Sequence, residues 1–221
     1  MSQVIAFEGI DGSGKTLQAE LLKDTLVAKG LRVLCMSFPV YDSFFGRECG
    51  LILSGRGDVR ADELDPKSMS LWYALDRWQA MKTVDMDAYD YVLLNRFTLS
   101  NVVYQSIRAR DEDRPRLADW IFELEHVQLA LPEPDIYVLF DVDPCVAGLN
   151  VRKKGHRDYV GDERDVYEQS TRLLTLARAK YLSLAQRLSN IKVVNCLDRN
   201  NSMRAPEKIA REVAALVKID G

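Results

Sequence analysis

Residues 9–16 carry the pattern Gly-x-x-x-x-Gly-Lys-Thr, whose residue types suit the binding of phosphate groups. The glycines let the main chain turn and bring its N–H groups close to an anion. Lys15 adds a positive charge for the β and γ phosphates, and the Thr16 hydroxyl can hold Mg²⁺. The pattern predicts a P-loop. The structural alternative is a glycine-rich turn that only happens to precede Lys-Thr, and the loop alone does not say whether a phosphoryl group goes to water or to a second substrate.

Other residues could contact a second substrate. Arg96 follows an apolar run, where a guanidinium can bind a phosphate through two parallel hydrogen bonds. Tyr73 and Arg77 are four residues apart on a predicted helix, so an aromatic ring and a cation share one face. An aromatic-rich helix of this kind can equally belong to the core. Asn101 and Tyr104 could hydrogen-bond a base or sugar, or could face solvent.

Two further stretches lie where such a site would be. Phe38-Pro39 ends another apolar run, and proline directs the chain away from the sheet at a defined angle, although packing alone can explain the pair. The segment 150–164 is rich in charge and contains two glycines. A charge run is usually a solvated face, but this one could close over phosphates as a mobile basic flap.

The elements that must position these residues alternate along the chain. Short apolar runs at 4–7, 33–38, 91–94, 136–140 and 192–196 predict strands, with helical stretches between them. Asp65-Pro66 opens one predicted helix, an amphipathic helix is expected from about 163 to 188, and Pro206 begins the last. This alternation predicts an α/β fold with a five-stranded parallel sheet flanked by helices on both faces. Ligands of such sheets bind beyond the carboxyl ends of the strands.

Composition excludes several classes of protein. The 221 residues suit one domain, expected to span 1–221, and no internal repeat or linker divides them. A net charge of −3 argues against a broad nucleic-acid or anionic-membrane surface. No apolar run reaches membrane-spanning length and no leader is evident, so we expect a cytoplasmic protein without membrane partners. Four dispersed cysteines and two histidines predict neither a disulfide framework nor a zinc site.

Taken together, these motifs resemble the thymidylate kinase family of nucleoside monophosphate kinases over essentially the whole chain. The resemblance rests on six stretches in order: FEGIDGSGKT (7–16), FPVY (38–41), LWYALDRW (71–78), NRFTLSNVVYQ (95–105), LPEPDIYVLFDVDP (131–144) and RKKGHRD (152–158). It implies that ATP·Mg²⁺ donates its γ-phosphoryl group to dTMP, giving ADP and dTDP. It also implies a homodimer.

The resemblance assigns roles to particular residues. The ATP phosphates would lie on Gly9, Ile10, Asp11, Gly12, Ser13, Gly14, Lys15 and Thr16, with Mg²⁺ on Thr16. dTMP would meet Asp11, Phe38, Tyr41, Tyr73, Arg77, Arg96, Asn101 and Tyr104. Within that set, Tyr73 would stack on thymine, Arg77 would reach its O4 edge, and Tyr104 would crowd C2′. The catalytic groups would be Lys15, Asp11, Arg96, Arg152 and Arg157.

Three departures from the family pattern keep alternatives open. Asn95 stands where many members have Asp, Val40 stands where an Arg is usual, and an arginine expected near Asn150 is missing. Asn brings no negative charge and cannot act as a base. One alternative is therefore a kinase for another nucleoside monophosphate or for a nucleoside. Another is a nucleotide-binding homologue that has lost phosphoryl transfer, and a nucleic-acid-binding protein fits less well.

Overall fold

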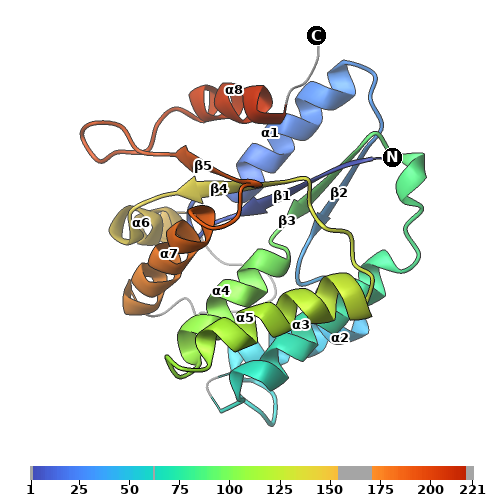
Figure 1. Ribbon diagram of the computed structural model, residues 1–221. Coiled ribbons are helices and arrows are strands. Elements are labelled where there is room, and N and C mark those ends of the chain that lie inside the picture. The colour runs from blue at the N-terminus through green and yellow to red at the C-terminus, as the bar shows by residue number, and fades with distance from the viewer. Residues whose placement is uncertain (1, 62, 154–170, 218–221) are drawn as a thin grey trace.

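A parallel β-sheet forms the centre of the molecule. The computed structural model describes residues 2–61, 63–153 and 171–217. The sheet has five strands in the order β2-β3-β1-β4-β5 (Figure 1). These are β1 (Gln3–Glu8), β2 (Val33–Ser37), β3 (Tyr91–Asn95), β4 (Ile136–Asp141) and β5 (Ile191–Asn195). Every strand end lies within one residue of its predicted position, which confirms the predicted α/β fold.

The central strand β1 is apolar because helices cover both of its faces. Val4, Ile5, Ala6 and Phe7 are buried, as are Val92 to Leu94 on β3 beside them. Continuous apolar runs of this kind are typical of parallel strands enclosed on both sides. Phe7 lies opposite Asn95 on β3 and opposite Val138 on β4. The residues that follow Glu8 and Asn95 therefore leave the sheet side by side.

Helices cover the two faces of the sheet in two layers (Figure 1). α1 (Lys15–Ala28) and α8 (Pro206–Val217) lie on one face, and α3, α4, α5 and α7 lie on the other. The remaining bounds are α2 (Phe44–Ser54), α3 (Pro66–Met81), η1 (Met86–Ala88), α4 (Thr98–Arg108), α5 (Arg114–Phe122), η2 (Glu123–Gln128), α6 (Pro144–Lys153) and α7 (Thr171–Ala185). The η1 segment is a 3₁₀-helix, and η2 is a π-helical continuation of α5.

The predicted helix starts are confirmed where the structure describes them. Asp65 caps α3 by accepting hydrogen bonds from the main-chain N–H groups of Lys67 and Ser68, and Pro66 is the first residue of the helix. Pro206 begins α8. Helix α7 accounts for 171–185 of the helix expected from 163 to 188, and the earlier residues lie outside the described ranges.

Within residues 2–61, 63–153 and 171–217, no helix is both long enough and apolar enough to span a bilayer.

Candidate active site

The glycine-rich loop joins the central strand to α1 at the carboxyl end of the sheet. It has a backbone that side chains would not tolerate at two positions. Gly12 has φ +82°, and a Cβ there would lie 2.1 Å from the carbonyl oxygen of Ala147 in α6. Gly14 has φ +93° at the start of α1. These left-handed conformations favour glycine. The loop is thus held against α6 while the N-terminus of α1 supplies N–H groups for an anion.

Lys15 lies across this loop. Its Nζ atom donates hydrogen bonds to the carbonyl oxygens of Gly9 at 3.0 Å and Ile10 at 2.9 Å, and the residue is only 5% exposed. The Asp11 carboxylate lies 4.0 Å from Nζ. The ammonium group is therefore already fixed at the mouth of the loop.

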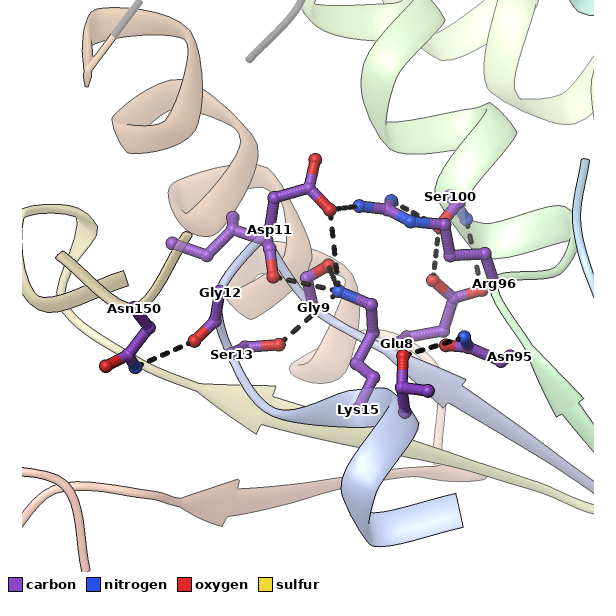
Figure 2. Close-up of polar contacts among 12 residues, drawn as sticks. Glu8, Gly9, Asp11, Gly12, Ser13, Lys15, Asn95, Arg96, Ser100 and Asn150 are labelled. Carbon is purple, nitrogen blue, oxygen red and sulfur yellow. Dashed lines mark hydrogen bonds and ion pairs between the residues drawn. The ribbon is translucent and has the colours of Figure 1, made fainter. Parts of the chain in front are cut away.

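Asp11 also pairs with Arg96, which brings the P-loop and the end of β3 together. The Asp11 carboxylate lies between Lys15 and the Arg96 guanidinium in Figure 2. Arg96 also donates a 3.4 Å hydrogen bond to the Ser100 hydroxyl, and its guanidinium lies 5.7 Å from the centre of the Tyr104 ring. Four residues predicted from the sequence, namely Asp11, Lys15, Arg96 and Tyr104, thus form one cluster.

The backbone at Arg96 turns sharply. Its φ is +61°, a region that residues with a Cβ seldom adopt, and its N–H donates to the carbonyl oxygen of Phe7. Such strain is frequent at binding sites. Burial acts to lower the pKa of Arg96, but the combined attraction of Asp11, Tyr104, Tyr181 and Glu8 outweighs it and raises the pKa well above the usual value. Arg96 therefore stays charged beside the place where phosphates would bind.

Glu8 is a supporting residue that the sequence analysis did not identify. It is fully buried, and its carboxylate accepts hydrogen bonds from the N–H groups of Phe97 and Ser100 and from the hydroxyls of Ser100 and Tyr181. Burial raises its pKa, while these hydrogen bonds and the charge of Arg96 oppose the rise. Glu8 therefore ties the end of β1 to the start of α4 (Figure 2).

A second group of predicted residues lies between α3 and α4. Arg77 is 2% exposed and forms a two-pronged ion pair with Glu125, at 2.8 and 2.5 Å. Asn101 is equally buried and donates to Glu125 and to the carbonyl oxygen of Ser70. Phe38 packs against Phe97 with ring centres 5.7 Å apart. The Arg77 guanidinium lies 5.8 Å from the centre of the same Phe97 ring, so Phe38 and Arg77 share Phe97 as a neighbour.

The structure decides between some of the alternatives left by the sequence. Asn101, Tyr104 and Gln105 are all 9% exposed or less, so the solvent-facing interpretation of these polar residues is wrong. Tyr73 and Tyr41 are half-buried, on α3 and in the loop before α2. Neither Tyr73 nor Tyr41 belongs to the fully buried core.

The loop that carries Phe38 and Tyr41 is anchored to α3 by Asp76. This buried carboxylate accepts the Val40 N–H at 3.1 Å and the Ser43 hydroxyl at 3.1 Å. Burial raises the pKa of Asp76, and the two hydrogen bonds together with Arg77 oppose that rise. The side of α3 that carries Asp76 thus fixes the loop beside the Arg77 group.

Comparison with known proteins agrees with this geometry. The family model described as "Thymidylate kinase" matches residues 7–204. The chain belongs to the thymidylate kinase family. It is 33% identical over 186 residues to the thymidylate kinase of Mycobacterium tuberculosis (strain ATCC 25618 / H37Rv), covering 82% of this chain and 85% of that protein. It is 30% identical over 218 residues to a probable thymidylate kinase of Sulfurisphaera tokodaii, covering 99% of both chains. A probable thymidylate kinase of Pyrococcus abyssi is 26% identical over 217 residues, covering 97% of this chain and 95% of its own.

The Asn95 side chain of this member of the thymidylate kinase family lies beside Thr16, the residue predicted to hold Mg²⁺. Its Nδ2 group donates to the Thr16 hydroxyl at 3.2 Å and to the Ser37 hydroxyl at 3.3 Å. Its Oδ1 atom is buried and has no hydrogen-bond partner within the described part of the chain. Mg²⁺ prefers oxygen ligands, so the Thr16 hydroxyl suits it, whereas the Asn95 group that faces this hydroxyl is a hydrogen-bond donor.

The predicted basic flap of this thymidylate kinase family member begins in α6. Asn150 lies in that helix and donates a 3.0 Å hydrogen bond to the carbonyl oxygen of Gly12, so the start of the segment touches the P-loop (Figure 2). Arg152 lies in the last turn of α6, and its side chain is not described. Arg157 lies outside the described residues, as does most of the flap.

Proposed function

We propose that this protein is a dTMP kinase, which transfers the γ-phosphoryl group of ATP to dTMP and releases ADP and dTDP. The observation that carries the proposal is the cluster of Lys15, Asp11 and Arg96 in a chain of the thymidylate kinase family. It brings a donor-side lysine and an acceptor-side arginine to one carboxylate.

In phosphoryl transfer the protein mainly positions the two substrates and neutralises the charge of their phosphates. An oxygen of the dTMP phosphate forms the new bond to the γ-phosphorus, and the bond from that phosphorus to the bridging oxygen of ADP breaks. Lys15 would stabilise the charge that develops on the phosphoryl oxygens. Arg96 would hold the dTMP phosphate, because a guanidinium has five N–H donors and the contacts to Asp11 and Ser100 leave others free for a ligand. Thr16, with Asn95 nearby, would hold Mg²⁺, which neutralises phosphate charge when bound.

The base of dTMP would lie near Arg77 and Asn101. Phe38, Tyr41 and Tyr73 would surround it, with Tyr73 stacked on the ring and Tyr104 near C2′ of the sugar. Arg152 and Arg157 of the flap at 150–164 would add positive charge beside the transferred group. Val40 brings no cation to this acceptor side, which leaves Arg96 as the principal partner of the dTMP phosphate in the proposed site.

The partners and setting belong to the same proposal. The chain would act as a single kinase domain over 1–221, in the cytoplasm, as a homodimer and without nucleic acid or membrane. Exposed apolar side chains on α2 and α3 support association of two copies: Phe44 is 53% exposed and Leu71 is 39% exposed. Sedimentation equilibrium tests this point, since a monomer has a mass of 25.1 kDa.

A coupled ADP-release assay tests the activity. It uses ATP·Mg²⁺ with dTMP, dUMP, dCMP, dGMP or UMP as acceptor. The expected result is ADP release that is fastest with dTMP. Release with another acceptor alone would point to a different nucleoside monophosphate kinase. ATP binding without release for any acceptor would favour the second candidate, a nucleotide-binding protein without transfer, for which Asn95 in place of Asp is the motivating observation.

A further inference from the structure

Glu125 is a buried carboxylate that has no assigned role in the reaction. It is 0% exposed and lies in the π-helical segment η2. Four side-chain donors surround it. Arg77 donates from Nε at 2.8 Å and from Nη2 at 2.5 Å, Thr98 donates at 2.7 Å, and Asn101 donates at 2.8 Å. A carboxylate offers about four lone-pair sites, so its capacity as an acceptor is filled.

Stability alone does not explain a buried ion pair of this kind. Removing two charges from water costs about as much as their attraction returns, and apolar residues of the same volume often stabilise a protein as well. Arg77 and Glu125 are nonetheless both almost completely buried, with side chains 2% and 0% exposed. A buried network that is fully satisfied does fix the orientation of every group in it.

The fixed orientation matters most at Asn101. Its Nδ2 group donates to the Glu125 carboxylate and to the Ser70 carbonyl oxygen, at 2.8 and 3.0 Å. Both partners can only accept hydrogen bonds, so the amide cannot turn over without placing oxygen against oxygen. Oδ1 must therefore face away from them, and it is buried without a hydrogen-bond partner within the described residues. Glu125 thus directs the Asn101 Oδ1 atom, a hydrogen-bond acceptor, away from itself and from Ser70.

The Glu125 carboxylate also fixes the orientation of the neighbouring donor, the Arg77 guanidinium. The Glu125 Oε1 atom receives both Arg77 Nη2 and Asn101 Nδ2, so the guanidinium and the amide lie side by side. The pair presents a donor from Arg77 next to an acceptor from Asn101. Thymine offers the complementary pattern, an O4 acceptor next to an N3–H donor. Cytosine offers the reverse, with an amino donor at C4 and an acceptor at N3.

The main chain around Glu125 is π-helical, which affects where its side chain points. The six residues of η2 follow α5 without a break, and Leu129 N–H donates to the carbonyl oxygen of Leu124, five residues back. A π-turn admits one more residue than an α-turn and so changes the direction of the side chains that follow. Glu125 is buried while its neighbours Leu124 and His126 are only partly so. Segments of this kind are frequent at functional sites.

We propose that Glu125 is a positioning residue that sets thymine against cytosine specificity by fixing the amide of Asn101 and the guanidinium of Arg77. The proposal rests on the proposed dTMP kinase activity. Glu125 touches neither substrate in this proposal and acts only through the two side chains that do.

The test is the substitution Glu125→Gln, measured as kcat/KM for dTMP and for dCMP. Gln keeps the shape but replaces one acceptor oxygen by an NH₂ donor, so Asn101 gains a partner that allows its amide to turn over. The ratio of kcat/KM for dTMP to kcat/KM for dCMP should fall at least about tenfold. The change should appear mainly in KM for dTMP, with KM for ATP unchanged.

Thr98→Val is the matched control. It removes one donor from the same carboxylate but leaves the bonds to Arg77 and Asn101, so the specificity ratio should stay at the wild-type value. Equal losses with both acceptors in Glu125→Gln, or an equal fall of the ratio in Thr98→Val, would overturn the proposal. If the charge is needed for folding, Glu125→Asp keeps it on a side chain one carbon shorter, and the ratio should still fall. Lack of wild-type activity with dTMP would instead contradict the proposed function.

Discussion

At the scale of single residues, the site is assembled through carboxylates that each lie between two hydrogen-bond donors. Asp11 lies between Lys15 and Arg96, and Glu125 lies between Arg77 and Asn101. Each holds its partners in place without a ligand. A preorganised arrangement of charge is what electrostatic stabilisation of a transition state requires.

Replacing Lys15 by Ala should mainly slow phosphoryl transfer. Removal of a preorganised donor to developing negative charge lowers kcat by about 10²- to 10³-fold. KM for dTMP should change little, because Lys15 lies on the ATP side. Steady-state kinetics measures both values. Lys23→Ala, on the exposed side of the same helix, is the control and should leave kcat unchanged. Unchanged turnover in Lys15→Ala would remove Lys15 from the transition state.

Glu8→Gln should change how stability depends on pH. Because the pKa of Glu8 is raised above its ordinary value of 4.5 in the folded protein, its stabilising contribution is complete below that pH. The contribution is lost as the pH rises through the raised value. Gln does not titrate, and its amide can donate to the Ser100 and Tyr181 hydroxyls. Urea unfolding between pH 4 and 8 should therefore show the wild type losing stability relative to the variant as pH rises. A difference that stays constant would contradict the assignment.

The charged residues of the site divide into those that sequence can predict and those that it cannot. Lys15 is recognisable from the Gly-x-x-x-x-Gly-Lys-Thr pattern, and Arg96 is recognisable because it follows an apolar run at the carboxyl end of a strand. Glu8 and Glu125 look like ordinary surface carboxylates. Their burial depends on partners far along the chain, 89 residues away for Phe97 and 48 residues away for Arg77.

At the scale of elements, α3 links the two halves of the acceptor site. Asp76 holds the loop with Phe38 and Tyr41 from one side of the helix, while Arg77, the next residue, pairs with Glu125. The five strands and the starts of α3 and α8 were predictable, because apolar runs and capping residues are local signals. The strand order and the π-turn of η2 were not, since strand pairing is non-local and a π-turn has no hydrophobic period of its own.

Asp76→Ala should impair both stability and acceptor binding. Leaving the Val40 N–H without its buried partner costs about 1–3 kcal/mol of unfolding free energy. KM for dTMP should rise because the loop is released, while KM for ATP stays the same. Asp65→Ala is the control on the same helix, where loss of the cap costs about 1 kcal/mol without touching the loop. Chemical unfolding and kinetics together test this, and an equal rise of KM in both variants would contradict it.

At the scale of the whole molecule, the two substrates would bind on either side of one carboxylate, so their effects on stability should be separable. dTMP at a hundred times its dissociation constant should stabilise the protein by about 2.7 kcal/mol. Arg96→Ala should abolish most of that shift at the same dTMP concentration and keep the shift with a non-hydrolysable ATP analogue.

Thermal unfolding with each ligand measures the two shifts. Arg32→Ala is the control. Arg32 forms an exposed ion pair with Asp90, and both residues lie just before β2 and β3, at the edge of the sheet away from the site. Its substitution should leave both stability shifts intact. Loss of the ATP shift alone in Arg96→Ala would place Arg96 on the donor side instead.

The position of β1 in the sheet limits the order in which the strands can pair during synthesis. Its neighbours are β3 and β4, and the Val4 N–H donates a hydrogen bond to the carboxylate of Asp135, 131 residues further along the chain. A ribosome releases the strand that precedes the P-loop long before either neighbour. The apolar run of β1 must therefore stay unpaired until β3 has been made, and contacts at such sequence separation make folding slow. Until β3 and β4 have left the exit tunnel, the exposed apolar surface of β1 makes the nascent chain prone to aggregate.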